Sequence, residues 1–161
     1  MNDQTPKSGA ADSPSEAAPN PAEFYRETVL QHSVEPVGFQ AEIEPTHAAE
    51  RYNPLCGDRV TVRFRVAGDR IEAAAFDGEA CAICLASASL LCEKTPGHTL
   101  SELQSTSQWL ESLLQGEDQE GGDDDLRALS GVRRYPSRIR CALLPWEAAG
   151  LAVSESGDPD D

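Results

Sequence analysis

The chain has 161 residues, a length typical of one domain with a single hydrophobic core. Its net charge of −15 argues against binding to the phosphate backbone of nucleic acids, which requires clustered cations. The sequence shows no signal peptide and no apolar run of about 18 residues, so we expect a cytoplasmic protein that does not interact with a membrane.

The two ends of the chain differ in composition from its middle. Residues 1–20 are dominated by Ala, Ser, Pro, Asp and Asn and contain no large apolar side chain after Met1. Such a segment cannot bury enough surface to offset its ordering entropy, so we expect it to be disordered. Residues 154–161 are polar and acidic and predict a second disordered tail. The folded domain is therefore expected to span residues 21–153.

The first half of this domain predicts a helix followed by strands. An Asn-Pro-Ala-Glu sequence supplies an N-cap and a first-turn proline for a helix over residues 21–32. Residues 38–52 predict one or two short strands. In residues 60–66, Val and Phe alternate with Thr and Arg, which is typical of a half-buried strand. A Gly-Asp turn and a return strand over residues 70–76 complete a β-hairpin.

The second half predicts helices. Residues 81–93 are small and apolar without Gly or Pro, which indicates a buried helix, and a Thr-Leu-Ser-Glu capping box opens an amphipathic helix at residue 99. An insertion at about residues 116–134 begins with an acidic run that predicts a solvated loop. A last helix is expected over residues 137–149, bent or shortened by Pro145, which cannot donate a backbone hydrogen bond. This order of elements predicts an α+β domain.

The cysteines are the candidate functional residues. They number five, and the absence of an export signal disfavours a disulfide framework. Cys56 is expected on a loop, Cys81 where a loop becomes a helix, and Cys141 on the last helix. Their spacing does not match the close ligand pairs of zinc fingers, so the fold would have to assemble any site formed with Asp58. Thiolates and a carboxylate suit zinc or iron, but three unrelated buried cysteines remain the alternative.

A resemblance to a known family rests on three motifs that occur in the same order. They are Asn-Pro-Leu-Cys-Gly-Asp at residues 53–58, Phe-Asp-Gly-Glu-Ala-Cys-Ala-Ile at residues 76–83, and Arg-Ile-Arg-Cys-Ala at residues 138–142. These motifs closely resemble the iron–sulfur cluster assembly scaffolds called IscU, SufU and the N-terminal domain of NifU. The SufU branch is the most similar, because it too has an extra segment before the last cysteine. The chain also has Arg140 where IscU has a histidine.

The resemblance implies a SufE/NifU-like fold, with an N-terminal helix, a small antiparallel sheet and helices packed on one face. It implies a metal site that holds zinc, as in SufU-like proteins, or a two-iron cluster, with the ligands Cys56, Asp58, Cys81 and Cys141. The implied partners are a cysteine desulfurase and cluster acceptor proteins. Cys56 corresponds to the sulfur acceptor, and Asp58 is expected to exchange more easily than a fourth thiolate would.

Three further residues are candidates for auxiliary roles. Arg138 and Arg140 flank Cys141 and either pair with Asp58, neutralise an anionic site, or are ordinary exposed arginines. Cys84 forms a Cys-x-x-Cys with Cys81, so the alternative function is a thiol redox protein. The plainer interpretation is a cysteine packed within a helix. A structural binding module is a further alternative, and the sequence leaves open whether the chain is an enzyme. Its three histidines are expected at the surface or in loops.

Overall fold

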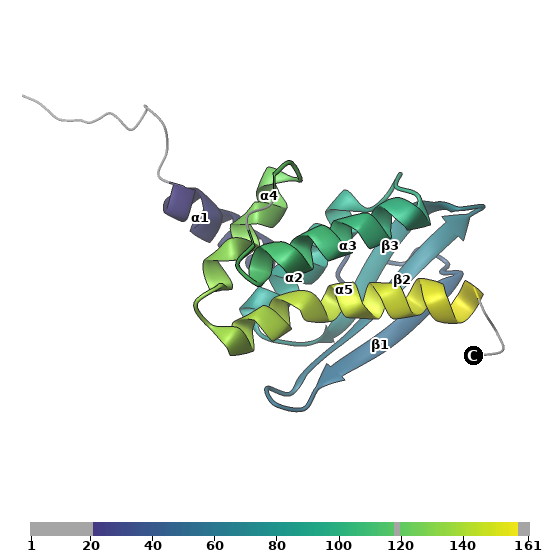
Figure 1. The fold of residues 1–161 in the computed structure, drawn as a ribbon. Helices are drawn as coiled ribbons and strands as arrows, with labels where there is room; N and C mark the ends of the chain where they lie inside the picture. Colours follow the sequence, from purple (N-terminus) through teal and green to yellow (C-terminus); the bar gives the residue numbers. More distant parts are fainter. Residues whose placement is uncertain (1–20, 118–119, 158–161) are drawn as a thin grey trace, which may run out of the picture.

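The computed structural model describes residues 21–117 and 120–157, so the predicted disorder of residues 1–20 lies outside the described residues. A three-stranded antiparallel sheet packs against helices, which confirms the predicted α+β class (Figure 1). The elements in chain order are α1 (Pro21–Val34), β1 (His47–Asn53), β2 (Asp58–Ala67), β3 (Arg70–Glu79), α2 (Ala82–Lys94), α3 (Leu100–Leu114), α4 (Asp124–Arg127), the 3-10 helix η2 (Ala128–Val132) and α5 (Pro136–Gly157).

The sheet has the strand order β1-β2-β3, and the predicted hairpin forms β2 and β3. Alternate side chains of β2, including Val60, Val62 and Phe64, are buried beneath the helices. Gly78 is required in β3, because a Cβ atom at this position would clash with the carbonyl oxygen of Arg59 on the neighbouring strand. Because β3 ends at Glu79, its close pairing with β2 fixes the position of the segment that leads to Cys81.

Helices cover one face of the sheet, with α5 against β1 and β2 and α2 against β3 (Figure 1). Helix α1 packs on α2 rather than on the sheet. His32 of α1 is half-buried, and its Nδ1 lies 2.6 Å from the hydroxyl of Ser89 on α2, so the expected surface position is wrong for this histidine. No helix in the described part of the chain is long and apolar enough to cross a membrane.

The last helix is longer than the sequence predicted, because α5 continues through Pro145 to Gly157. It therefore includes residues 154–157, which were expected to belong to the acidic tail. Buried side chains lie on both sides of the proline, among them Trp146 and Ala152. Packing of this apolar face on the sheet outweighs the one backbone hydrogen bond that Pro145 cannot make.

The acidic insertion is more ordered than a solvated loop, as far as its residues are described. Asp123 caps α4 by accepting hydrogen bonds from the backbone of Asp125 and Leu126. Lys94, at the end of α2, contacts the carboxylates of Asp123 at 3.3 Å and Asp125 at 2.8 Å. These charged contacts raise the pKa of Lys94 against the opposing effect of its burial. The insertion is therefore held against the body of the domain.

Candidate metal centre

The loop between β1 and β2 presents the first two candidate ligands. The Asn53 side chain accepts a hydrogen bond of 3.0 Å from the amide of Leu55, and its carbonyl accepts one of 2.7 Å from Gly57. Gly57 has a φ of +81°, a conformation that favours glycine. This turn leaves Cys56 exposed at its tip, while Asp58 begins β2 and is buried.

The other two candidate ligands come from the helices that cover the sheet. Cys81 is the N-cap residue of α2, and its backbone amide donates a 2.9 Å hydrogen bond to Oδ1 of Asp58. Cys141 lies on α5 and is 1% exposed. Three elements that are distant in the sequence therefore meet at the β1–β2 turn.

Three of the predicted ligands converge closely. A sulfur or carboxylate oxygen of each of Cys56, Asp58 and Cys141 lies within 4.8 Å of the others. The two Sγ atoms are 3.8 Å apart. The second carboxylate oxygen of Asp58, Oδ2, is buried and has no hydrogen-bond partner among the described residues. A buried oxygen without a partner is costly unless it binds a cation, and two thiols with a carboxylate form a donor set that suits zinc.

Cys81 lies beside this trio, and its thiol interacts with both Asp58 and Cys141. Burial alone would raise the pKa of Asp58, but the neighbouring thiol of Cys141 and the amide of Cys81 lower it below 3.8. Burial and the nearby Asp58 carboxylate raise the pKa of the Cys141 thiol. Without a cation the site therefore pairs an ionised Asp58 with a protonated Cys141.

Of the three auxiliary candidates, one lies beside the thiols and the other two fit the plainer interpretations given above. The guanidinium of Arg138 lies near Cys81 and Cys141, and these sulfurs raise its pKa. Neither Arg138 nor Arg140 forms an ion pair with Asp58 among the residues that the structure covers. Cys84 is fully buried, and its burial, followed by the charge of Asp58, raises the pKa of its thiol. A buried, protonated thiol is a weak nucleophile, which favours the packed-cysteine interpretation over a Cys81–Cys84 redox pair.

A supporting contact between the two ligand-bearing helices was not predicted from the sequence. The hydroxyl of Ser87 on α2 donates a 2.5 Å hydrogen bond to the carbonyl of Ala142 on α5. The same hydroxyl accepts a 3.1 Å hydrogen bond from the indole nitrogen of Trp146. All three residues are buried. The only sequence signal was the presence of serines within a mostly apolar helix, where a buried hydroxyl needs partners.

The chain matches a known protein family over most of its length. The model of the family described as the NifU-like N-terminal domain matches residues 24–154 of the chain, and this range includes all four candidate ligands. The chain belongs to the NifU-like N-terminal domain family. The resemblance inferred from the three motifs is therefore confirmed.

Two relatives and one solved structure are similar to this NifU-like chain over most of its length. The zinc-dependent sulfurtransferase SufU of Bacillus subtilis (strain 168) is 33% identical over 139 residues, covering 84% of this chain and 94% of the relative. The iron–sulfur cluster assembly scaffold protein IscU of Streptococcus pyogenes serotype M1 is 30% identical over 139 residues, covering 84% and 86%. The crystal structure of a nitrogen-fixing NifU-like protein (N-terminal) from Brucella abortus has a TM-score of 0.76 at 22% identity, covering 84% and 96%, which supports the fold.

Proposed function

We propose that this chain is an iron–sulfur cluster assembly protein of the SufU type, which binds zinc and accepts sulfur from a cysteine desulfurase. The observation that carries the proposal is the convergence of two thiols and a buried carboxylate within 4.8 Å at an exposed turn. The relatives named as a zinc-dependent sulfurtransferase and a cluster assembly scaffold support the same function. The inferred ligands are Cys56, Asp58, Cys81 and Cys141.

The residues of the site have distinct roles in this proposal. When bound, zinc keeps its cysteine ligands as thiolates at neutral pH. Oδ1 of Asp58 is held by the amide of Cys81, which leaves Oδ2 as the oxygen that binds the metal. Arg138 lies beside the sulfurs and compensates part of their negative charge. Asp58 is the ligand most easily displaced, because a carboxylate binds zinc less tightly than a thiolate does.

Cys56 is the residue that accepts sulfur, because it is the exposed thiol of the site, whereas Cys141 is buried and Cys81 is half-buried. The Cys56 thiolate attacks the outer sulfur of a persulfide on the desulfurase cysteine. A new sulfur–sulfur bond forms at Cys56 while the bond within the donor persulfide breaks. The donor cysteine leaves as a thiolate, so the transfer needs no external oxidant or reductant. Cluster acceptor proteins then receive the product of assembly.

The test combines metal analysis with sulfur transfer. Purified wild-type protein is assayed for zinc, iron and sulfide, its visible spectrum is recorded, and it is then incubated with a cysteine desulfurase and cysteine. We expect one zinc per chain, no colour, and a mass increase of one sulfur atom that Cys56→Ala abolishes. The matched control is Cys92→Ala, which removes a buried thiol of the core and should still accept sulfur.

A brown protein containing iron and sulfide would instead identify a scaffold that builds a two-iron cluster. A protein that holds no metal and takes up no sulfur would refute both functions. Sulfur uptake that persists in Cys56→Ala would refute the assignment of the acceptor.

A further inference from the structure

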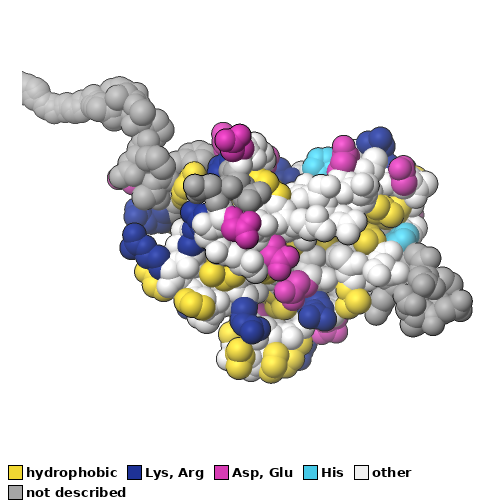
Figure 2. Space-filling view, viewed as in Figure 1, with side chains coloured by type: hydrophobic (Ala, Val, Ile, Leu, Met, Phe, Trp, Pro, Cys, Tyr) yellow, Lys and Arg dark blue, Asp and Glu magenta, His cyan; other side chains and the backbone are white. Residues whose placement is uncertain are grey.

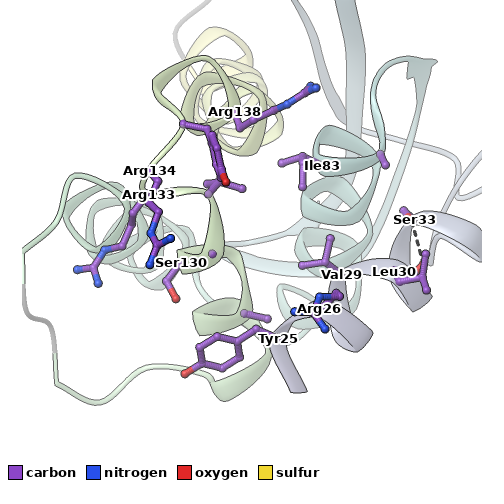
Figure 3. Close-up of a pocket in the computed structure, with 15 residues that line it drawn as sticks. Tyr25, Arg26, Val29, Leu30, Ser33, Ile83, Ser130, Arg133, Arg134 and Arg138 are labelled. Carbon is purple, nitrogen blue, oxygen red and sulfur yellow. Dashed lines mark hydrogen bonds between the residues drawn. The ribbon is translucent and has the colours of Figure 1, made fainter. Parts of the chain in front are cut away.

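A groove with a volume of about 980 Å³ lies between α1 and the segment that joins η2 to α5. Figure 3 shows Val29 and Arg26 of α1 on one side of this groove and Arg133 and Arg134 on the other, with Arg138 at one end. We refer to it as the arginine groove. Its volume is within the range of binding sites rather than of packing voids.

The charge of the arginine groove is opposite to that of the protein. Four arginines line it and no described acidic residue does, although the chain has 28 acidic residues and a net charge of −15. Figure 2 shows Lys and Arg side chains gathered at the end of the molecule where α1 and the start of α5 lie. A local cluster of cations on an acidic protein attracts negatively charged groups selectively.

Two of the four arginines are available to a ligand. Arg133 already donates hydrogen bonds to the carbonyls of Leu113 and Glu117, so its role is structural. Arg26 and Arg134 are exposed and form no ion pair within residues 21–117 and 120–157. Guanidinium groups bind carboxylates with paired hydrogen bonds, which makes carboxylates suitable ligands for these two side chains.

Apolar side chains complete the arginine groove. Val29 and Ile83 are half-buried within it, while Leu30 is 60% exposed and Tyr135 is 56% exposed at its rim. A small inorganic anion would leave this apolar surface in contact with water. A peptide segment that carries both carboxylates and an apolar side chain satisfies both halves of the groove.

The arginine groove also adjoins the metal centre, because Arg138 lines the groove and lies beside the thiols of Cys81 and Cys141. We propose that the groove docks an acidic segment of the cysteine desulfurase, with its carboxylates on Arg26 and Arg134 and an apolar side chain between Leu30 and Tyr135. This inference rests on the proposed function. Docking there brings the donor close to the metal centre, whose exposed thiol is Cys56.

The test is the affinity for a purified cysteine desulfurase, measured by calorimetry at low and at physiological salt. We expect Arg26→Glu/Arg134→Glu to raise the Kd at least about tenfold at low salt, while zinc content and sulfur uptake at saturating desulfurase stay unchanged. Arg26→Lys/Arg134→Lys should recover most of the affinity. The control Arg51→Glu/Arg70→Glu changes the net charge equally at exposed arginines outside the groove and should bind as the wild type does.

The outcomes separate this inference from the proposed function. If the wild type accepts sulfur and both double variants bind the desulfurase equally well, the arginine groove is not the docking site. An equal loss of affinity in both would mean that only net charge matters, which also overturns the inference. If the wild type itself accepts no sulfur from the desulfurase, the proposed function fails, and the partner assigned to the groove fails with it. The variant Leu30→Ser/Tyr135→Ser tests the apolar half and should weaken binding several-fold at physiological salt, where charges are partly screened.

Discussion

The buried contact between Ser87 and Trp146 provides a quantitative test of how the two ligand-bearing helices are held together. Ser87→Ala removes the hydroxyl that accepts the indole N–H of Trp146 and donates to the carbonyl of Ala142. The methyl group of alanine fits the same space, so the change is chiefly a loss of hydrogen bonding. The Trp146 side chain is 1% exposed, and no water can replace the missing acceptor.

The expected cost follows from the unpaired donor that this change leaves. A buried polar group without a partner costs about 1–3 kcal/mol, so we expect Ser87→Ala to lower the free energy of unfolding by about 2 kcal/mol. For a domain of this size, that loss corresponds to a decrease in Tm of about 4–8 °C. Trp146→Phe removes the donor itself, so the two changes together should cost about 1–2 kcal/mol less than the sum of the single changes.

The assay is urea unfolding of the wild type, both single variants and the double variant in metal-free buffer, followed by circular dichroism. Metal-free conditions isolate the contribution of the protein, because metal binding would add its own stabilisation. Additive costs would show that the hydroxyl and the indole are not coupled. A Ser87→Ala variant as stable as the wild type would refute the reasoning that this contact joins the helices.

Three further predictions concern the metal site and the insertion. Chelation of the metal should lower the Tm of the wild type. Cys141→Ala should lose both metal and stability, whereas Cys56→Ala should remain largely folded. Equal unfolding of the two variants would contradict this division of roles. Asp58→Ala should slow sulfur transfer more than it reduces metal content, and an equal loss of both would make Asp58 a purely structural ligand. The pKa of Lys94 is raised above its ordinary value of 10.5, so its ion pairs should contribute fully to stability below that pH and lose their contribution as the pH rises through the raised pKa. Unfolding curves of the wild type and Lys94→Met should therefore converge at high pH. Curves that stay apart would contradict the ion-pair contribution.

Most of the secondary structure could be predicted because the local signals were strong. The alternation in β2, the Gly-Asp turn that leads into β3, the capping box of α3 and the mostly apolar α2 each follow from a rule that acts within a few residues. The length of α5 could not be predicted in this way. Pro145 is a local signal for a helix end, but burial of Trp146 and Ala152 against other elements overrides it.

The candidate site was predictable in its composition but not in its geometry. The motifs around Cys56 and Asp58 pointed to the ligand residues, and the structure brings these two together with Cys141. The orientation of Arg138 towards the thiols, and not towards Asp58, depends on where the first turn of α5 lies. The arginine groove had no sequence signal, because its arginines come from segments that only the tertiary structure brings together.

The wide separation of the candidate ligands along the chain has a consequence for when the site can form. Cys56 and Cys141 are 85 positions apart, and closing a loop of this length in an unfolded chain costs about 4 kcal/mol in entropy. An unfolded chain therefore does not bring the thiols of Cys56 and Cys141 together as a chelating pair. On the proposed function, the complete four-residue site forms only in chains that have completed their tertiary structure. A partner that recognised the complete site would therefore bind only folded chains.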